Sequence, residues 1–274
     1  MVIPFTEPTH ICWNVTNRCN SECLFCFRDK NQLDSELPIE DNMRILKNII
    51  DSDRKRITWS GGEALLYNGI DRLIRYASEH GIVNTLITNG RALSAHEFEE
   101  VLPFVDVLTL PLDSCDSIVN HNIGRGANQL ALVENILLYV KSRWPGIKIR
   151  INTCVSAMNI HSVCEMSSFI ARNKIDCWKL FCFADLRGNS VINRDILSIS
   201  DDDFKDLEYR ISNIIRRDSR CATITKFADR RSLECGYYII CPNGDLVTTE
   251  NGCDICLGNL LNIKLSDLID VTCF

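Results

Sequence analysis

Alternation of short apolar runs with segments of helical periodicity constrains the fold of this chain more than any other feature. Strand-like runs recur at 11–16, 56–60, 83–88, 105–112, 147–153 and 177–183. Between them lie segments whose apolar residues recur every three or four positions, as in amphipathic helices. Strands that alternate with helices form a parallel sheet covered by helices. The order therefore predicts an α/β protein with six β-α units, either as an open doubly wound sheet or as a partial barrel.

The pattern changes after residue 183. A capped amphipathic helix is expected over 201–216, and a hairpin with strands at 237–241 and 246–249 follows it. We therefore divide the chain into a core at 1–183 and an α+β extension at 184–274. Because active sites of parallel barrels lie at the carboxyl ends of the strands, we expect the extension to cover the active site there.

Composition argues against two classes of function. Thirty lysines and arginines against 36 aspartates and glutamates give a formal charge of −6, which does not suit general nucleic-acid binding. No apolar run approaches the roughly 20 residues of a membrane span, and the first residues lack the basic segment of a signal peptide. Fifteen cysteines without an export signal indicate a reducing compartment. We expect a cytoplasmic monomer that binds neither nucleic acid nor membrane.

Three cysteines follow the first predicted strand, Cys19, Cys23 and Cys26, in a C-x3-C-x2-C arrangement. With this cysteine content, the arrangement is expected by chance about 0.045 times in the chain. Iron–sulfur cubanes are usually held by four cysteine thiolates. Three clustered ligands therefore indicate a [4Fe-4S] cluster with one iron left open to bind another molecule.

The cysteine triplet, with Phe25 just before its last member, resembles that of the radical S-adenosylmethionine (SAM) superfamily. The resemblance implies a partial (βα)6 TIM-like barrel in which Cys19, Cys23 and Cys26 hold the cluster and its open iron binds SAM. It also implies an electron from an external reductant such as flavodoxin or ferredoxin. Cleavage of SAM then gives methionine and a 5′-deoxyadenosyl radical, which abstracts a substrate hydrogen.

Three further segments resemble SAM contacts of that superfamily. Gly61, Gly62 and Glu63 end the second predicted strand, where adjacent glycines let the backbone approach a ligand closely. They resemble a Gly-Gly-Glu-Pro segment that contacts the SAM amino group, although Ala64 replaces the proline. Asn89 and Ser114, after the third and fourth strands, resemble ribose contacts, and each is also a typical turn or N-cap residue.

Strand alternation predicts a basic interior, because side chains two residues apart share a face. On each of their strands, Arg56, Arg150 and Lys179 point to one face. The apolar residues of the same strands point to the other face: Ile57, Trp59, Ile149, Ile151, Trp178 and Leu180. Asn14 lies on the corresponding face of the first strand. Unpaired buried cations are costly, so we expect an anion in the cavity, and a phosphorylated substrate is the simplest one. The alternative is that these charges lie at strand ends in water or pair with carboxylates.

The segment 113–126, which ends in Ile-Gly-Arg-Gly, resembles the viperin branch of the superfamily, and weaker likeness extends over about 10–210. Viperins bind a nucleoside triphosphate through basic residues. The resemblance implies that Arg56, Arg150, Lys179 and Arg125 bind phosphates. It implies loss of the 3′-hydroxyl as water, giving a 3′-deoxy-3′,4′-didehydro nucleotide, an antiviral chain terminator. Cys177 stands where an arginine would support triphosphate binding.

The predicted C-terminal hairpin keeps a second substrate class open. Its turn at 242–245 and the run at 257–260 resemble small radical SAM epimerases, dehydratases and crosslinking enzymes that act on peptides or antibiotics. In that interpretation an auxiliary cluster is held by four C-terminal cysteines, Cys235, Cys241, Cys253 and Cys256. A lone C-x2-C pair is expected about 0.8 times by chance, so reduced cysteines acting as small hydrophobes are preferred. A catalytically silent metal-binding or nucleotide-sensing protein is the third interpretation. No catalytic acid or base is identified.

Overall fold

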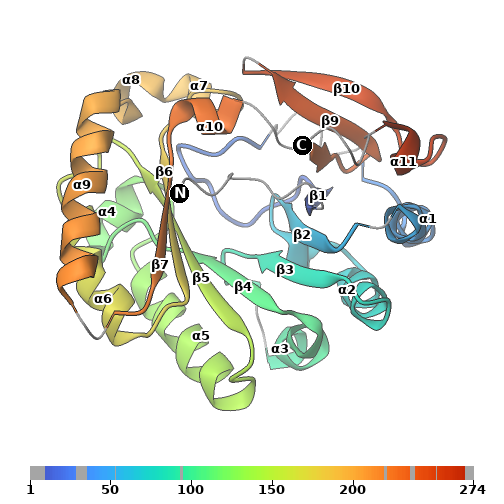
Figure 1. Cartoon of the computed structure of the whole chain (residues 1–274), viewed down its shortest axis with the longest axis horizontal. Helices are drawn as coiled ribbons and strands as arrows, with labels where there is room; N and C mark the ends of the chain where they lie inside the picture. The colour runs from blue at the N-terminus through green and yellow to red at the C-terminus, as the bar shows by residue number, and fades with distance from the viewer. Residues whose placement is uncertain are drawn as a thin grey trace.

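One sheet organises the computed structural model, which describes residues 10–28, 36–52, 54–92, 95–218, 221–234, 238–250 and 252–268. The strands run in the order β10-β9-β8-β1-β2-β3-β4-β5-β6-β7 (Figure 1). Their bounds are β1 His10–Thr16, β2 Arg56–Gly61, β3 Val83–Ile87, β4 Val107–Pro111, β5 Lys148–Val155, β6 Cys177–Cys182, β7 Ile224–Ala228, β8 Tyr238–Ile240, β9 Asp245–Glu250 and β10 Cys253–Asn259.

Helices connect successive strands from β1 to β8, and most of them lie on the outside of the curved sheet (Figure 1). The α-helices are α1 Ile39–Asp51, α2 Ile70–Glu79, α3 Ala95–Val101, α4 Ser117–Asn122, α5 Gln129–Arg143, α6 Met166–Arg172, α7 Asn189–Ile192, α8 Arg194–Leu197, α9 Asp201–Arg217, α10 Arg230–Glu234 and α11 Leu265–Leu268. Short 3-10 helices lie at Ala64–Leu66, Leu102–Phe104 and Val163–Glu165. Within the described ranges, no helix has the length and apolar character needed to cross a membrane.

Strands β1 to β7 and β8 are parallel, whereas β9 and β10 form an antiparallel hairpin at one edge. Strands β7 and β10 end the sheet, so it is not closed, and the predicted α/β partial barrel is confirmed. Two strands were not anticipated from the sequence, β7 and β10. The reason for β7 is physical: it has five residues with Lys226 at its centre, so it lacks the apolar run typical of a buried parallel strand.

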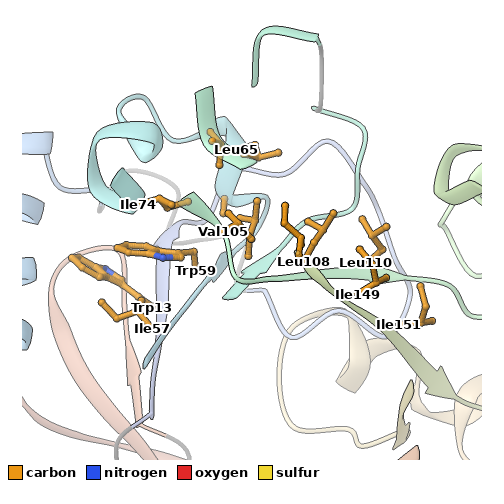
Figure 2. Packing of buried hydrophobic residues seen from close by; sticks show 14 of the residues in the cluster. Trp13, Ile57, Trp59, Leu65, Ile74, Val105, Leu108, Leu110, Ile149 and Ile151 are labelled. Atoms are coloured by element: carbon orange, nitrogen blue, oxygen red, sulfur yellow. The ribbon is translucent and has the colours of Figure 1, made fainter. Parts of the chain in front are cut away.

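The apolar faces of the strands pack under the surrounding helices (Figure 2). Ile57, Trp59, Ile151 and Trp178 are fully buried there, as the alternation predicts. Each such side chain contributes on the order of 1.5–3 kcal/mol when removed from water. The opposite faces carry half-buried polar residues, including Asn14, Arg56, Arg150, Asn152 and Lys179, so the sheet has an apolar outer face and a polar inner face.

Asn84 is a buried polar link within the apolar layer. Its side-chain amide donates to the carbonyls of Ile74 (3.1 Å) and Phe104 (2.9 Å), and its side-chain oxygen accepts from the Trp59 indole (2.8 Å). The Trp59 ring stacks on Trp13 with centroids 5.3 Å apart. Asn84 therefore ties β2 and β3 to the segments on either side of them.

We expect Asn84→Ala to lower the free energy of unfolding by about 3 kcal/mol, because it leaves the buried Trp59 indole without its partner and removes the side-chain bonds to two carbonyls. Thermal and urea unfolding of the metal-free protein measure the change. Asn173→Ala is the matched control, since it removes a single bond to the Phe169 carbonyl (3.0 Å) at a half-buried site. Equal losses in the two variants would contradict the role of Asn84.

Candidate active site

The loop that carries the three cysteines begins at the carboxyl end of β1 and is pressed against the end of β2. The Gly62 amide donates to the Thr16 carbonyl (2.7 Å), and the Glu63 amide donates to the Arg18 carbonyl (2.8 Å). A Cβ at Gly61 would lie 2.3 Å from the Thr16 carbonyl oxygen, and one at Gly62 would lie 2.2 Å from that of Arg18. Gly61 also has φ of +134°, which favours glycine. The two glycines are therefore required for the backbones to meet.

The far side of the cysteine loop is held by the segment that follows α4. The Leu24 amide donates to the Ile123 carbonyl (3.1 Å). Gly124 has φ of +83°, and a Cβ there would lie 2.3 Å from the Glu22 carbonyl oxygen. The Ile-Gly-Arg-Gly run therefore packs against the loop through its backbone, and this close contact requires glycine at position 124.

Residues after β6 contact the loop from a third side. The side-chain amide of Asn189 donates to the Cys23 carbonyl (3.0 Å), and that of Asn193 donates to the Leu24 carbonyl (3.1 Å). A Cβ at Gly188 would lie 2.5 Å from the Arg28 carbonyl oxygen. The cysteine loop is thus fixed by its backbone before any metal is considered.

The three thiols are suited to an iron–sulfur cluster. None of the three thiols forms a disulfide. Burial raises the pKa of the Cys19 and Cys23 thiols, and the charge of the nearby Cys26 raises both pKa values further. The side-chain amide nitrogen of Asn89 lies 3.7 Å from the Cys19 sulfur, and the backbone amide nitrogen of Arg28 lies 3.4 Å from the Cys26 sulfur. Such donors stabilise the negative sulfurs of a cluster. In the described ranges no three His, Cys, Asp or Glu side chains converge on one ion position. A cubane differs, because its cysteine ligands bind separate irons.

Glu63 joins the ends of β2 and β3 beside the loop. Its carboxylate accepts from the Asn89 amide (2.7 Å) and from the Leu65 amide (3.3 Å). The side chain is buried, and burial raises its pKa although these hydrogen bonds oppose the shift. The Asn89 side-chain amide in turn donates to the Asn20 oxygen (2.7 Å). The structure therefore brings Gly61, Gly62, Glu63 and Asn89 together around the start of the cysteine loop.

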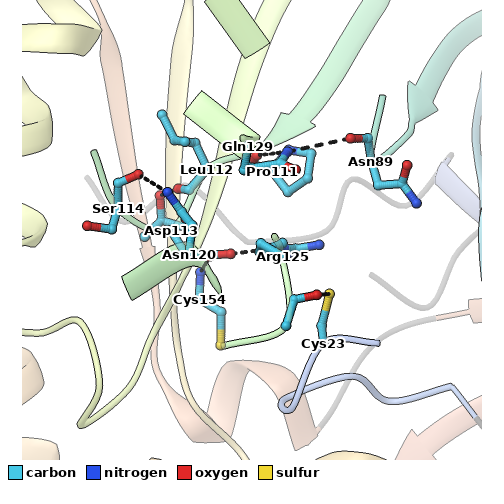
Figure 3. Close-up of polar contacts among 12 residues, drawn as sticks. Cys23, Asn89, Pro111, Leu112, Asp113, Ser114, Asn120, Arg125, Gln129 and Cys154 are labelled. Carbon is cyan, nitrogen blue, oxygen red and sulfur yellow. Dashed lines mark hydrogen bonds and ion pairs between the residues drawn. The ribbon is translucent and has the colours of Figure 1, made fainter. Parts of the chain in front are cut away.

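Asp113 and Arg125 form a buried ion pair near Cys23 (Figure 3). The Asp113 carboxylate accepts from Arg125 Nε at 2.7 Å and from the Cys154 amide at 2.7 Å. The Arg125 guanidinium also lies 4.9 Å from the centre of the Phe25 ring. Sequence reasoning assigned Arg125 to phosphate, and the structure places it between β5 and the cysteine loop.

Ser114 also lies at the carboxyl ends of the strands, directly after β4, and is fully buried. Its hydroxyl accepts from the Asp116 amide (3.0 Å) and lies 3.4 Å from the Ser162 hydroxyl. Its carbonyl accepts from the Asn120 amide at 2.7 Å (Figure 3). Ser114 is thus separated from the Asn89 group and engaged in the turn before α4.

The predicted phosphate ligands divide along the inner face. Arg150 and Lys179 lie on the adjacent strands β5 and β6, close to the β7 edge of the sheet, where Asn152 is paired in register with Lys179. Asn14 is paired in register with Ser60 near the carboxyl end of β1. Arg56 is the first residue of β2, about 13 Å along the strand from Ser60 at 3.3 Å per residue. The structure therefore places Arg150 and Lys179 on adjacent strands, whereas Arg56 lies at the amino end of β2, away from the end that contacts the cysteine loop.

Sequence reasoning missed two contributors. Asp113 orients Arg125, and the signal for it is an aspartate directly after a buried strand. Lys226 extends the inner polar face onto β7, where it is paired in register with Lys179. No periodicity marks Lys226, because β7 lacks an apolar run.

The comparisons with known proteins agree with this geometry. Residues 13–162, more than half of the chain, match the model of the radical SAM superfamily. A Flammeovirga pacifica protein named S-adenosylmethionine-dependent nucleotide dehydratase is 28% identical over 71% of this chain and 69% of its own. A Lacinutrix mariniflava protein of the same name is 28% identical over 68% of this chain, and the match spans 40% of that protein.

Solved structures show the same fold. The crystal structure of Streptococcus suis SuiB bound to S-adenosylmethionine superimposes with a TM-score of 0.76 over 95% of this chain and 65% of SuiB, at 20% identity. At that identity the likeness concerns the fold alone. The cysteine loop, the partial barrel and the family match lead to one conclusion. The chain belongs to the radical SAM superfamily, whose members use a [4Fe-4S] cluster and SAM.

Proposed function

We propose that this protein dehydrates a nucleoside triphosphate to a 3′-deoxy-3′,4′-didehydro nucleotide, an antiviral chain terminator. The observation that carries the proposal is a group of buried polar atoms on the inner face. In the part of the chain described, Arg150 Nε, Asn152 Oδ1 and Thr109 Oγ1 are buried without a hydrogen-bond partner. Because native buried polar groups are normally paired, this face suits a polar ligand. The names of the curated relatives support a nucleotide as that ligand.

The chain's own residues have separate tasks in this proposal. Cys19, Cys23 and Cys26 would hold the cluster, which together with SAM supplies the radical that removes a substrate hydrogen. Glu63 and Asn89 hold the strand ends beside the cysteine loop, and we assign Gly61, Gly62 and Ser114 with them to SAM. The guanidinium of Arg150 suits a phosphate because it presents several donors in one plane.

The remaining assignments have less support. Lys179 shares the inner face with Arg150, so we propose that both orient phosphates, with Asn14 nearer the reacting end of the substrate. We keep Arg56, at the start of β2, among the phosphate ligands. The ion pair of Arg125 with Asp113 favours a role in fixing the cysteine loop. An external reductant such as flavodoxin or ferredoxin would deliver the electron.

We also propose that residues 184–274 are an extension that covers the active site. The bonds from Asn189 and Asn193 to the cysteine loop support this role. The extension also contributes β7 to one edge of the sheet and β8 to β10 to the other. It therefore flanks the inner face on both sides.

The alternative of a peptide- or antibiotic-modifying enzyme depends on an auxiliary cluster. Cys253 and Cys256 both lie within β10, three residues apart, so the alternation of a strand directs them to opposite faces. Cys235 lies outside the described residues. This geometry favours reduced cysteines over a second cluster.

The decisive experiment measures 5′-deoxyadenosine in the anaerobically reconstituted protein with dithionite and SAM. We expect one of the four ribonucleoside triphosphates to raise its yield well above that without nucleotide, because substrate positions the hydrogen that is abstracted. The control is Cys26→Ala, which removes one cluster ligand and should abolish the product. A yield unaffected by every nucleotide would overturn the proposal, and about eight irons per chain would favour the auxiliary-cluster alternative.

Replacing Arg150 with Met should weaken nucleotide binding about 10- to 100-fold, since a charge-assisted hydrogen bond contributes on the order of 1.5–3 kcal/mol. The Kd for SAM should change less than about 3-fold, because Arg150 lies away from the cysteine loop. Isothermal titration measures both constants. Arg172→Met is the control, because this exposed arginine pairs with Glu134 (3.4 Å) on the outer surface. Equal losses for SAM and nucleotide would contradict the assignment.

Gly62→Ala should reduce iron loading to less than about half, because the new Cβ would meet the Arg18 carbonyl and displace the cysteine loop. Iron content and visible absorbance after reconstitution measure the effect, and far-UV circular dichroism checks that the fold is retained. Gly146→Ala is the control, since a Cβ at that position would meet no atom within 4 Å. Full iron content in Gly62→Ala would show that the loop tolerates the displacement.

A further inference from the structure

Lys226 projects onto the inner face of the sheet from β7, which lies beside β6 (Figure 1). Its neighbour Phe227 packs against Phe204 of α9, with ring centroids 6.3 Å apart. Phe227 therefore faces the outer helical layer, and alternation directs Lys226 to the opposite face. Lys226 is paired in register with Lys179, which is paired with Asn152. Three polar side chains thus form one row across β5, β6 and β7.

The carboxylate nearest to Lys226 in sequence, Asp229, is engaged elsewhere, as is Asp201 of α9. Asp229 accepts from the Ser232 amide (2.8 Å), and Asp201 pairs with Arg230 (3.1 Å). Among the described residues the structure gives the half-buried Lys226 no ion-pair partner. Lys226 therefore adds a half-buried positive charge to this row, and an anionic ligand would compensate it.

The position of Lys226 bears on Cys177, the residue that replaces an arginine expected for triphosphate binding. Cys177 lies in the adjacent row, paired in register with Arg150 on one side and Ile224 on the other. Lys226 is two residues beyond Ile224 on the same face of β7. A lysine on β7 therefore lies on the inner face one strand away from Cys177, where it can supply a positive charge that Cys177 does not.

We propose that Lys226 binds the terminal phosphate of the substrate and makes the enzyme select triphosphates over monophosphates. This inference rests on the proposed nucleotide dehydratase function. Arg150 and Asn152 contact the phosphates nearer the ribose, and Lys226 lies farthest along the row from β4. A lysine ammonium suits a terminal phosphate, because its three donors and flexible stem follow a group that carries the most charge.

The test compares Kd values of the reconstituted protein with SAM for one nucleoside as its mono-, di- and triphosphate. The nucleoside is the one whose triphosphate most stimulates 5′-deoxyadenosine formation. We expect Lys226→Met to weaken triphosphate binding at least about 10-fold and monophosphate binding less than about 2-fold. Inorganic tripolyphosphate, as a base-free competitor, should lose potency in the same proportion. Lys226→Arg should recover most of the triphosphate affinity.

Lys148→Met is the matched control, since Lys148 shares the inner face but is exposed at the start of β5 and pairs with Asp176 (3.4 Å). It should change none of the three constants. Equal weakening of all three phosphates by Lys226→Met, or no weakening of the triphosphate, would overturn the assignment of Lys226 while wild-type turnover stands. If no nucleotide stimulates the wild-type protein, the proposed function itself fails and the inference falls with it. The two failures are thus distinguished by the wild-type result.

Discussion

The close contact between the end of β2 and the start of the cysteine loop is the constraint on which the site depends. Two backbone hydrogen bonds, from Gly62 to Thr16 and from Glu63 to Arg18, join the two segments. They form because no side chain separates the segments, and a Cβ at either glycine would overlap a carbonyl oxygen. The same contact brings Glu63 to the Asn89 amide and so fixes the end of β3. The positions of the carboxyl ends of β1, β2 and β3 thus depend on glycine at positions 61 and 62.

This constraint explains why a cluster loop can be ordered by protein contacts alone. The loop is bonded on one side to β2, on a second to the segment after α4, and on a third to Asn189 and Asn193. A ligand loop held in this way loses little further conformational freedom when metal binds. The buried ion pair of Asp113 and Arg125 serves the same end, because it anchors the second of these segments to β5. The ion pair acts by fixing the position of this segment, because a buried ion pair adds little net stability to the fold.

Much of the fold was predictable from the sequence, because parallel strands that alternate with helices leave a strong periodic signal. The outer residues Ile57, Trp59 and Trp178 were assigned correctly by alternation alone. The failures are the two strands at the sheet edges, β10 and β7, and in β7 Lys226 interrupts the apolar pattern. The register of β7 on β6 depends on contacts between residues far apart in the chain, such as Phe227 with Phe204, which one sequence does not reveal.

The site was predictable where chemistry is local and less so where it depends on packing. The cysteine triplet and the glycine pair lie in short motifs, and the resemblance to the superfamily drew attention to both. Arg125 shows the limit: the motif drew attention to it, but its partner Asp113 is known only from the fold. The inner face shows the reverse case. Alternation singled out Arg150 and Lys179, and register adds Lys226 to a row with Asn152 and Lys179. A row of this kind is a property of the sheet, since residues of three strands lie side by side only through the register of those strands.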